Sequence, residues 1–216
     1  MQQDPGVFAI PIQLDEGLEC DRSAFRDVCL RAQRRLMRFA REHGWQDCMT
    51  RPFAQAWRVF SDKRQFDEKL RMLCGVGEDV PIPSTYCAAL EKDTLISVSP
   101  ALYSMLFPQG IEPDAYEKLI THEFAHRLHI RILQGNEDAM GPIWFFEGFA
   151  LLAADQLIDA APVLDRDGIV RVVESQERED YRRYVTVIRH FVARAPLREL
   201  VERAGRTDFT EWLTCL

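Results

Sequence analysis

Apolar residues recur at helical spacing in the first long segment of the chain, 21–43. They return every three or four positions and so share one face of a helix: Phe25, Val28, Cys29, Ala32, Leu36, Phe39 and Ala40. Gly44 follows and is suited to end the helix. The other face is rich in arginine: Arg22, Arg26, Arg31, Arg34, Arg35, Arg38 and Arg41. We expect that charged face to be solvated rather than to bind an anion.

Shorter apolar runs predict strands, and four runs qualify: 7–12, 54–60, 85–90 and 94–98. A proline in the first run restricts it to the edge of a sheet. Ser61 can cap a short helix that runs toward Leu73. From Pro113 onward the pattern is almost continuously helical. The predicted fold class is α+β, with a mixed α/β N-terminal part that contains a small sheet and a mainly helical C-terminal part.

Length and composition favour one globular domain. The 216 residues are 47% hydrophobic and 28% charged, which is sufficient for a substantial core. No repeat and no Gly/Ser-rich linker divides the chain. We therefore predict a single domain over 1–216, composed of a mixed α/β subdomain over 1–134 and a helical subdomain over 135–216.

Charge and targeting signals narrow the expected partners. The formal net charge is −7, whereas a domain that binds nucleic acid usually carries an excess of positive charge. The best apolar run, 143–154, is too short to span a bilayer, and residues 1–5 lack the features of a secretory signal. We expect a cytoplasmic protein that binds neither nucleic acid nor membrane. Without a secretory signal, its six cysteines are expected to be reduced thiols, and the lack of a Cys-x-x-Cys pair gives no support to a cysteine zinc site.

The sharpest chemical signal is the segment HEFAH at 122–126, which has the form H-E-x-x-H. The interior of 113–135 contains no proline or glycine, as expected for a helix. Residues four apart on a helix differ by about 40° and rise about 6 Å, so His122 and His126 project from one face and can bind one metal ion. Glu123 points about 100° away from His122. Its carboxylate would lie beside the metal, where a general base is needed.

A third ligand is available in the apolar segment WFFEGFA at 144–150. It contains Glu147, and an unpaired carboxylate would be costly to bury there. A helix that begins near Pro142 would run back antiparallel to the first helix and present this carboxylate opposite the two histidines. Zinc with three protein ligands keeps one position open for water. The sequence therefore predicts a Zn²⁺ site with His122, His126 and Glu147 as its ligands.

The two segments together resemble the gluzincins, zincin metallopeptidases that bind zinc through two helical histidines and a downstream glutamate. Twenty residues separate His126 from Glu147, which is close to the family's usual spacing, and the W-x-x-E-G-F-A segment is similar to that of aminopeptidase-like gluzincins. The resemblance implies a zincin-like fold and catalysis by Glu123. The chain lacks the G-x-M-E-N segment that binds the substrate's amino end in the aminopeptidases. The resemblance therefore implies a zinc metallopeptidase but not the specificity of an aminopeptidase.

The reaction that this resemblance implies is hydrolysis of a peptide or protein substrate by a zinc-activated water. Glu123 would take a proton from the water and pass it to the departing amine. The family often stabilises the oxyanion with a tyrosine downstream of the glutamate, and Tyr181 and Tyr184 are the candidates. Tyr181 is preferred because its distance in sequence from the apolar segment 190–192 resembles the pattern in small members of the family. Zincins usually place an edge strand before the motif helix, and 94–98 would be that strand.

Other interpretations stay open at the level of sequence. The same ligands could belong to a non-catalytic zinc-binding module on a gluzincin-like scaffold, or the chain could be a metal-free helical scaffold. Glu123 favours an enzyme, because metal binding alone does not require it. His129 lies on the motif face but does not fit a three-histidine pattern, so we expect it beside the ligands or in solvent. The sequence does not specify the substrate, the choice between internal and terminal cleavage, or the oligomeric state.

Overall fold

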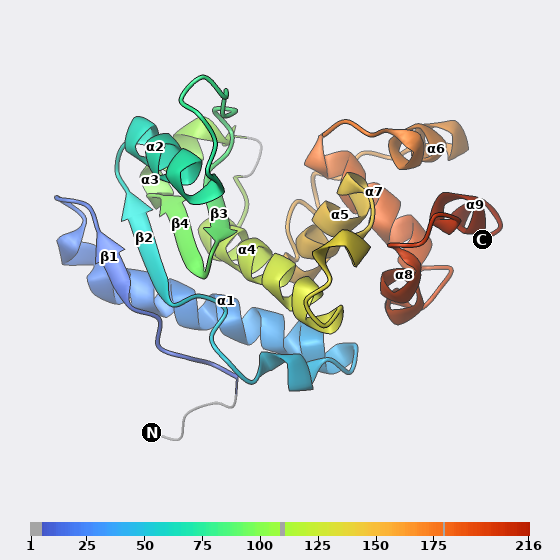
Figure 1. Cartoon of the computed structure of the whole chain (residues 1–216), viewed down its shortest axis with the longest axis horizontal. Coiled ribbons are helices and arrows are strands. Elements are labelled where there is room, and N and C mark those ends of the chain that lie inside the picture. The colour runs from blue at the N-terminus through green and yellow to red at the C-terminus, as the bar shows by residue number, and fades with distance from the viewer. Residues whose placement is uncertain (1–5, 109–110, 179) are drawn as a thin grey trace.

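Three stretches of the chain are described by the computed structural model: 6–108, 111–178 and 180–216. The predicted lack of a targeting signal at 1–5 falls outside them. The strands are β1 (Ile12–Leu14), β2 (Ala56–Phe60), β3 (Ala88–Glu91) and β4 (Thr94–Val98). The helices are α1 (Arg22–Glu42), α2 (Lys63–Cys74), α3 (Pro100–Leu106), α4 (Ala115–Ile132), α5 (Ile143–Ala154), α6 (Arg166–Glu174), α7 (Tyr181–Val192), α8 (Leu197–Arg203) and α9 (Phe209–Thr214). The predicted α+β class is confirmed, with the sheet in the N-terminal part and helices after it (Figure 1).

The four strands form one sheet in the order β1-β2-β4-β3. β1, β2 and β4 are parallel, whereas β3 runs antiparallel to β4. Lys92 and Asp93 both have positive φ and form the tight turn between β3 and β4. The strand expected at the edge, 94–98, is therefore an inner strand, and the edge strands are β3 next to it and β1 on the far side. That expectation was wrong because β4 pairs with β2 on one side and with its hairpin partner on the other.

Helices cover both faces of the sheet. Trp57 of β2 points toward α1, where its ring lies 5.7 Å from that of Phe25, and its indole N–H donates to the Ser97 hydroxyl of β4 at 2.8 Å. Phe60, at the end of the same strand, instead contacts Phe66 of α2 with a ring distance of 6.2 Å. α4 lies beside α1 and continues beyond the sheet toward the C-terminal helices (Figure 1). It therefore connects the layered part of the molecule to the helical part.

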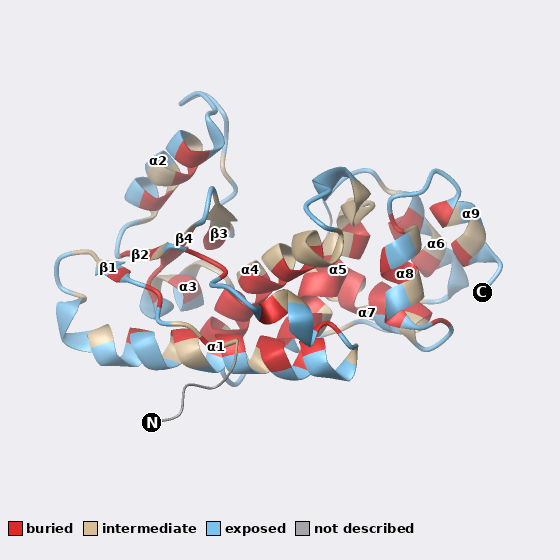
Figure 2. Ribbon diagram, turned by 60° about the horizontal axis from the view of Figure 1, so that its bottom comes forward, coloured by how far each residue is buried: buried red, intermediate tan, exposed pale blue. Residues whose placement is uncertain are grey.

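The C-terminal helices pack around α5. The ring of Trp144 lies 5.8 Å from Phe191 of α7 and 6.2 Å from Phe209 of α9. Gly148 allows α7 to approach, because a Cβ at this position would lie only 3.1 Å from the Cβ of Ile188. Buried residues follow α4, α5 and α7 through the centre of the molecule (Figure 2). Within the described stretches, no helix is long and apolar enough to cross a membrane.

The arginine face of α1 is only partly solvated. Arg31 and Arg35 both donate through Nε to the Glu117 carboxylate of α4, at 2.7 and 3.0 Å. The Glu117 side chain is only 7% exposed, so guanidinium groups replace much of its hydration. The expectation of a solvated face is wrong for the contact made by these two arginines, because α4 lies against that side of α1.

His129 of α4 is a core residue, and its expected position beside the ligands or in solvent was wrong. The side chain is fully buried and its ring lies 4.4 Å from that of Phe149, nearly parallel to it. Neither ring nitrogen has a hydrogen-bond partner among the described residues. Burial lowers the pKa of His129 to about 3. The residue is therefore a neutral ring in the contact between α4 and α5.

We predict that His129→Phe stabilises the protein, and increasingly so in acid. The unfolded chain protonates this histidine below about pH 6.5, but the folded chain does so only near pH 3, so the parent loses stability as the pH falls between these values. Phenylalanine keeps the ring contact and removes two unpaired polar atoms, for a gain of about 1–3 kcal/mol at pH 7. Urea denaturation should show the advantage in unfolding free energy widening by about 1.4 kcal/mol per pH unit between pH 6 and pH 4.

The control for this substitution is His190→Phe. His190 is only partly buried at the end of α7, so although burial and Arg194 lower its pKa, the advantage should depend less on pH than that of His129→Phe. A His129→Phe advantage that is the same at pH 7 and pH 4.5 would show that His129 is not held neutral by burial.

Candidate metal centre

α4 places the two histidines of the motif side by side. His122 and His126 lie one turn apart on a helix that is continuous over Ala115–Ile132. Their Nε2 atoms are 3.0 Å from each other and their ring centroids 4.7 Å. The helical spacing of the H-E-x-x-H segment therefore produces the convergence that was predicted from it.

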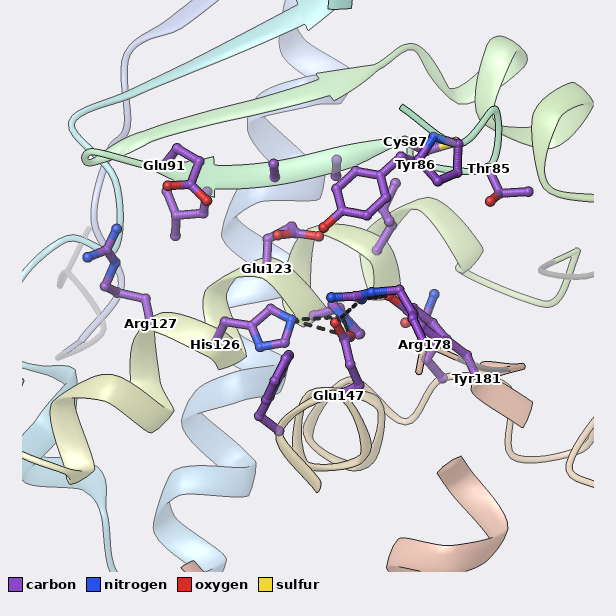
Figure 3. A pocket seen from close by; sticks show the side chains of 18 of the residues that line it. Thr85, Tyr86, Cys87, Glu91, Glu123, His126, Arg127, Glu147, Arg178 and Tyr181 are labelled. Carbon is purple, nitrogen blue, oxygen red and sulfur yellow. Dashed lines mark hydrogen bonds and ion pairs between the residues drawn. The ribbon is translucent and has the colours of Figure 1, made fainter. Parts of the chain in front are cut away.

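Glu147 reaches the histidines from α5, which packs against α4. Its Oε2 lies 3.1 Å from His122 Nε2 and 3.6 Å from His126 Nε2 (Figure 3). Glu147 is 3% exposed and His122 5% exposed, so these two side chains have left bulk water. The structure thus brings together all three residues predicted as ligands, although they come from two helices.

The donor set fits a divalent metal ion. Ligand bonds of about 2.0–2.1 Å in tetrahedral geometry place neighbouring ligand atoms about 3.3 Å apart. The three separations here are 3.0, 3.1 and 3.6 Å. Two imidazole nitrogens and a carboxylate oxygen are also donors that zinc accepts. His122, His126 and Glu147 therefore form a group that can hold a metal ion.

Glu147 and His126 shift each other's pKa in opposite directions. Burial alone would raise the pKa of Glu147, but the neighbouring histidines outweigh it and hold that pKa well below its usual value. Burial alone would lower the pKa of His126, but the Glu147 carboxylate outweighs it and raises that pKa. The carboxylate is consequently ionised, which a metal ligand must be. The charge that α5 buries is compensated by the imidazoles.

Glu123 lies next to this group without belonging to it. Its side chain lines the cleft and points across it toward Tyr86 (Figure 3). Burial raises the pKa of Glu123, against the opposing effect of His122 and His126. Its carboxylate forms no hydrogen bond or ion pair with any described residue. It is thus available to a molecule in the cleft.

The two candidate tyrosines occupy different environments. Tyr181, the first residue of α7, lines the cleft, and its ring is nearly parallel to that of His122 at 6.1 Å. Burial and the Glu147 carboxylate raise the pKa of Tyr181, so the hydroxyl stays neutral. Tyr184 is buried under α7, and its hydroxyl donates to the backbone carbonyl of Glu177 at 3.3 Å. The structure brings Tyr181 to the metal centre and leaves Tyr184 in the core.

Sequence reasoning missed Arg178 and Tyr86. Arg178 donates through Nη1 both to Glu147 Oε1 and to the Tyr181 hydroxyl, and its guanidinium carbon lies 5.9 Å from the ring centres of Tyr86 and Tyr181. Tyr86 precedes β3, and burial together with Glu123 raises its pKa to about 12. Neither residue carries a sequence signal, because one arginine in a polar loop and one tyrosine before a strand have no diagnostic spacing.

The metal-binding group lies in a cleft of about 1030 Å³ between the two parts of the chain. Residues of β3 and of the segment before it form one wall, and α4, α5 and the start of α7 contribute much of the rest. The lining carries charges of both signs: Glu91, Lys92, Glu123, Arg127, Glu137, Glu147, Arg178, Asp180 and Arg182. The cleft is large enough for several residues of a peptide and exposes both the ligands and the edge strand.

No protein-family model, no curated protein and no solved structure matches this chain. The feature that the described residues share with the gluzincins is the buried group of His122, His126 and Glu147, which can bind a metal.

We predict that the protein binds one divalent metal ion per chain at this group, and that His126→Ala weakens Zn²⁺ binding by about 100-fold or more. The substitution removes one of three donors and leaves Glu147 without one of the charges that compensate it. Competition with a chelating dye measures the affinity, and elemental analysis gives the stoichiometry. His190→Ala, which changes a histidine outside the cleft, should keep the parent's affinity. Equal affinities for both variants would place the metal elsewhere.

Proposed function

We propose that this chain is a zinc-dependent metallopeptidase of the gluzincin type, with His122, His126 and Glu147 as zinc ligands. One observation carries the proposal: three donor atoms converge beside an unpaired carboxylate, on the wall of a cleft bordered by the edge strand of a sheet. A ligand group of this kind with one open position is typical of catalytic rather than structural zinc.

Zinc bound here would supply Lewis acidity and a water of lowered pKa. Glu123 would act as the general base, taking a proton from the attacking water and giving it to the departing amine. Its position supports this role, because it follows His122 on α4 and faces the cleft (Figure 3). A carboxylate already engaged in an ion pair could not accept that proton as readily, and Glu123 has no such partner among the described residues.

Oxyanion stabilisation would fall to Tyr181. Its hydroxyl is neutral and accepts a hydrogen bond from Arg178, so its own proton is free to be donated into the cleft. A donor placed before the reaction begins costs no reorganisation when charge develops on the substrate. The same arginine brings a positive charge to this side of the cleft.

The substrate we propose is an extended segment of a peptide or protein. Among the described strands β3 pairs with β4 alone, so its other edge can hydrogen-bond to a substrate strand through backbone groups. Residues of β3 line the same cleft as the metal ligands. This assigns to β3 the role that the sequence suggested for 94–98. Backbone recognition of this kind favours short or flexible substrates.

We predict that Glu123→Gln keeps the parent's metal content and lowers kcat by about 10²–10⁴-fold. Glutamine preserves the shape of the side chain but cannot accept the proton. Peptide-library cleavage measures turnover, and elemental analysis of the same samples measures zinc. Full activity in this variant would remove Glu123 from the mechanism. A zinc-loaded parent that cleaves no peptide would instead favour the non-catalytic zinc-binding module.

We predict that the two tyrosines separate into one that affects catalysis and one that affects stability. Tyr181→Phe should lower kcat by about 10²-fold with little change in the melting temperature, because it removes a donor facing the cleft. Tyr184→Phe should lower the unfolding free energy by about 1 kcal/mol through loss of a buried hydrogen bond, and should keep kcat near that of the parent. Steady-state kinetics and thermal melts of both variants test the pair. The reverse pattern would assign the catalytic role to Tyr184.

A further inference from the structure

Arg178 joins three groups that lie far apart in the sequence. It belongs to the segment that leads into α7, and its Nη1 donates to Glu147 of α5 and to the Tyr181 hydroxyl. Its guanidinium carbon lies at the same distance, 5.9 Å, from the rings of Tyr181 and Tyr86. Tyr86 belongs to the opposite wall of the cleft (Figure 3). Arg178 is thus held at the edge of the metal-binding group from several directions.

The two carboxylate oxygens of Glu147 have different partners. Oε2 faces the imidazole nitrogens at 3.1 and 3.6 Å, whereas Oε1 accepts from Arg178. A guanidinium bonded to the second oxygen competes with a metal ion for that oxygen and so favours coordination through the first oxygen alone. A free carboxylate could bind through both oxygens and fill one further coordination position.

We propose that Arg178 is a positioning residue that restricts Glu147 to one-oxygen coordination and thereby keeps a coordination position of the metal open. The proposal rests on the function proposed above, because an open position matters only to a catalytic metal. Arg178 should also lower the affinity for the metal, because a positive charge beside a divalent cation opposes metal binding. In this role Arg178 weakens metal binding and leaves the bound metal more accessible and more electrophilic.

Repulsion between Arg178 and the cation predicts that removal of Arg178 changes the metal affinity in the opposite direction from a merely structural role. If Arg178 only supported the loop before α7, removing it would loosen the ligands and weaken metal binding. If it restrains Glu147 and repels the cation, removing it should strengthen metal binding. Affinity and coordination number should then change together, because the freed Oε1 becomes an additional ligand atom.

The test is titration of the purified protein with Co²⁺ and with Zn²⁺, using Arg178→Gln and Arg178→Met. Both changes remove the charge, and methionine keeps an apolar stem between the two tyrosine rings. We expect each variant to bind both ions about tenfold more tightly than the parent or better. We also expect weaker visible absorption bands for bound Co²⁺, as its coordination rises from four to five. Unchanged bands, or weaker metal binding, would overturn the proposal.

Two matched controls separate position from charge. Arg178→Lys keeps a positive charge that can reach Glu147, so its affinity should stay within about threefold of the parent's and its Co²⁺ bands should keep the parent's intensity. Arg182→Gln removes a neighbouring arginine that lines the same cleft but bonds to Asp180 instead. It should match the parent in both measurements. An Arg182→Gln variant with the same gain in affinity would reduce the effect to general electrostatics and overturn the assigned role.

The same titrations distinguish this inference from the proposed function. A parent that binds Co²⁺ and cleaves no peptide defeats the peptidase proposal, whereas the Arg178 variants still decide how Glu147 coordinates. A parent that cleaves peptides and whose Arg178 variants show unchanged Co²⁺ bands defeats only the role of Arg178. Circular dichroism of each variant ensures that the comparison is made between folded proteins.

Discussion

The arrangement of the C-terminal helices depends on one buried carboxylate. Glu147 is 3% exposed, and moving an isolated carboxylate out of water costs several kcal/mol. Its charge is compensated by the imidazoles of α4 on one oxygen and by Arg178 on the other. α4, α5 and the start of α7 must therefore meet in one arrangement for α5 to bury its polar residue. The packing that makes this charge tolerable is the same packing that assembles a metal-binding group.

The residues around Glu147 show how firmly α5 is held. Phe149 packs on the buried ring of His129, and Phe146 lies 5.9 Å from the ring of His126. Gly148 faces α7, where its lack of a side chain permits a close approach. The residues next to Glu147 in the sequence thus pack against α4 or α7. Ligands on well-packed helices keep their geometry better than ligands on loops, which favours a site organised before the metal arrives.

Local periodicity accounts for the part of the site that could be predicted from sequence. The spacing of His122 and His126 determines their shared face in any helix, and Glu147 is conspicuous as the one charge in an apolar run. The remaining features depend on contacts between distant segments. Arg178 meets Glu147 across 31 positions, and β3 becomes the edge strand only because β4 also pairs with β2. The same limit applies to His129, whose burial is decided by how α5 lies on α4.

The number and surroundings of the ligands bear on the choice between a catalytic and a structural metal. A structural zinc site is usually closed by four protein ligands. Among the described residues the group has three members, and the carboxylate nearest to it in sequence, Glu123, faces the cleft instead of completing the set. Arg178 engages the second oxygen of Glu147, and in the role proposed for it this contact would also keep that oxygen from binding the metal. A site evolved only to hold a metal would gain affinity by closing both openings. An open position of this kind supports the catalytic role proposed for the site, in which another molecule reaches the metal.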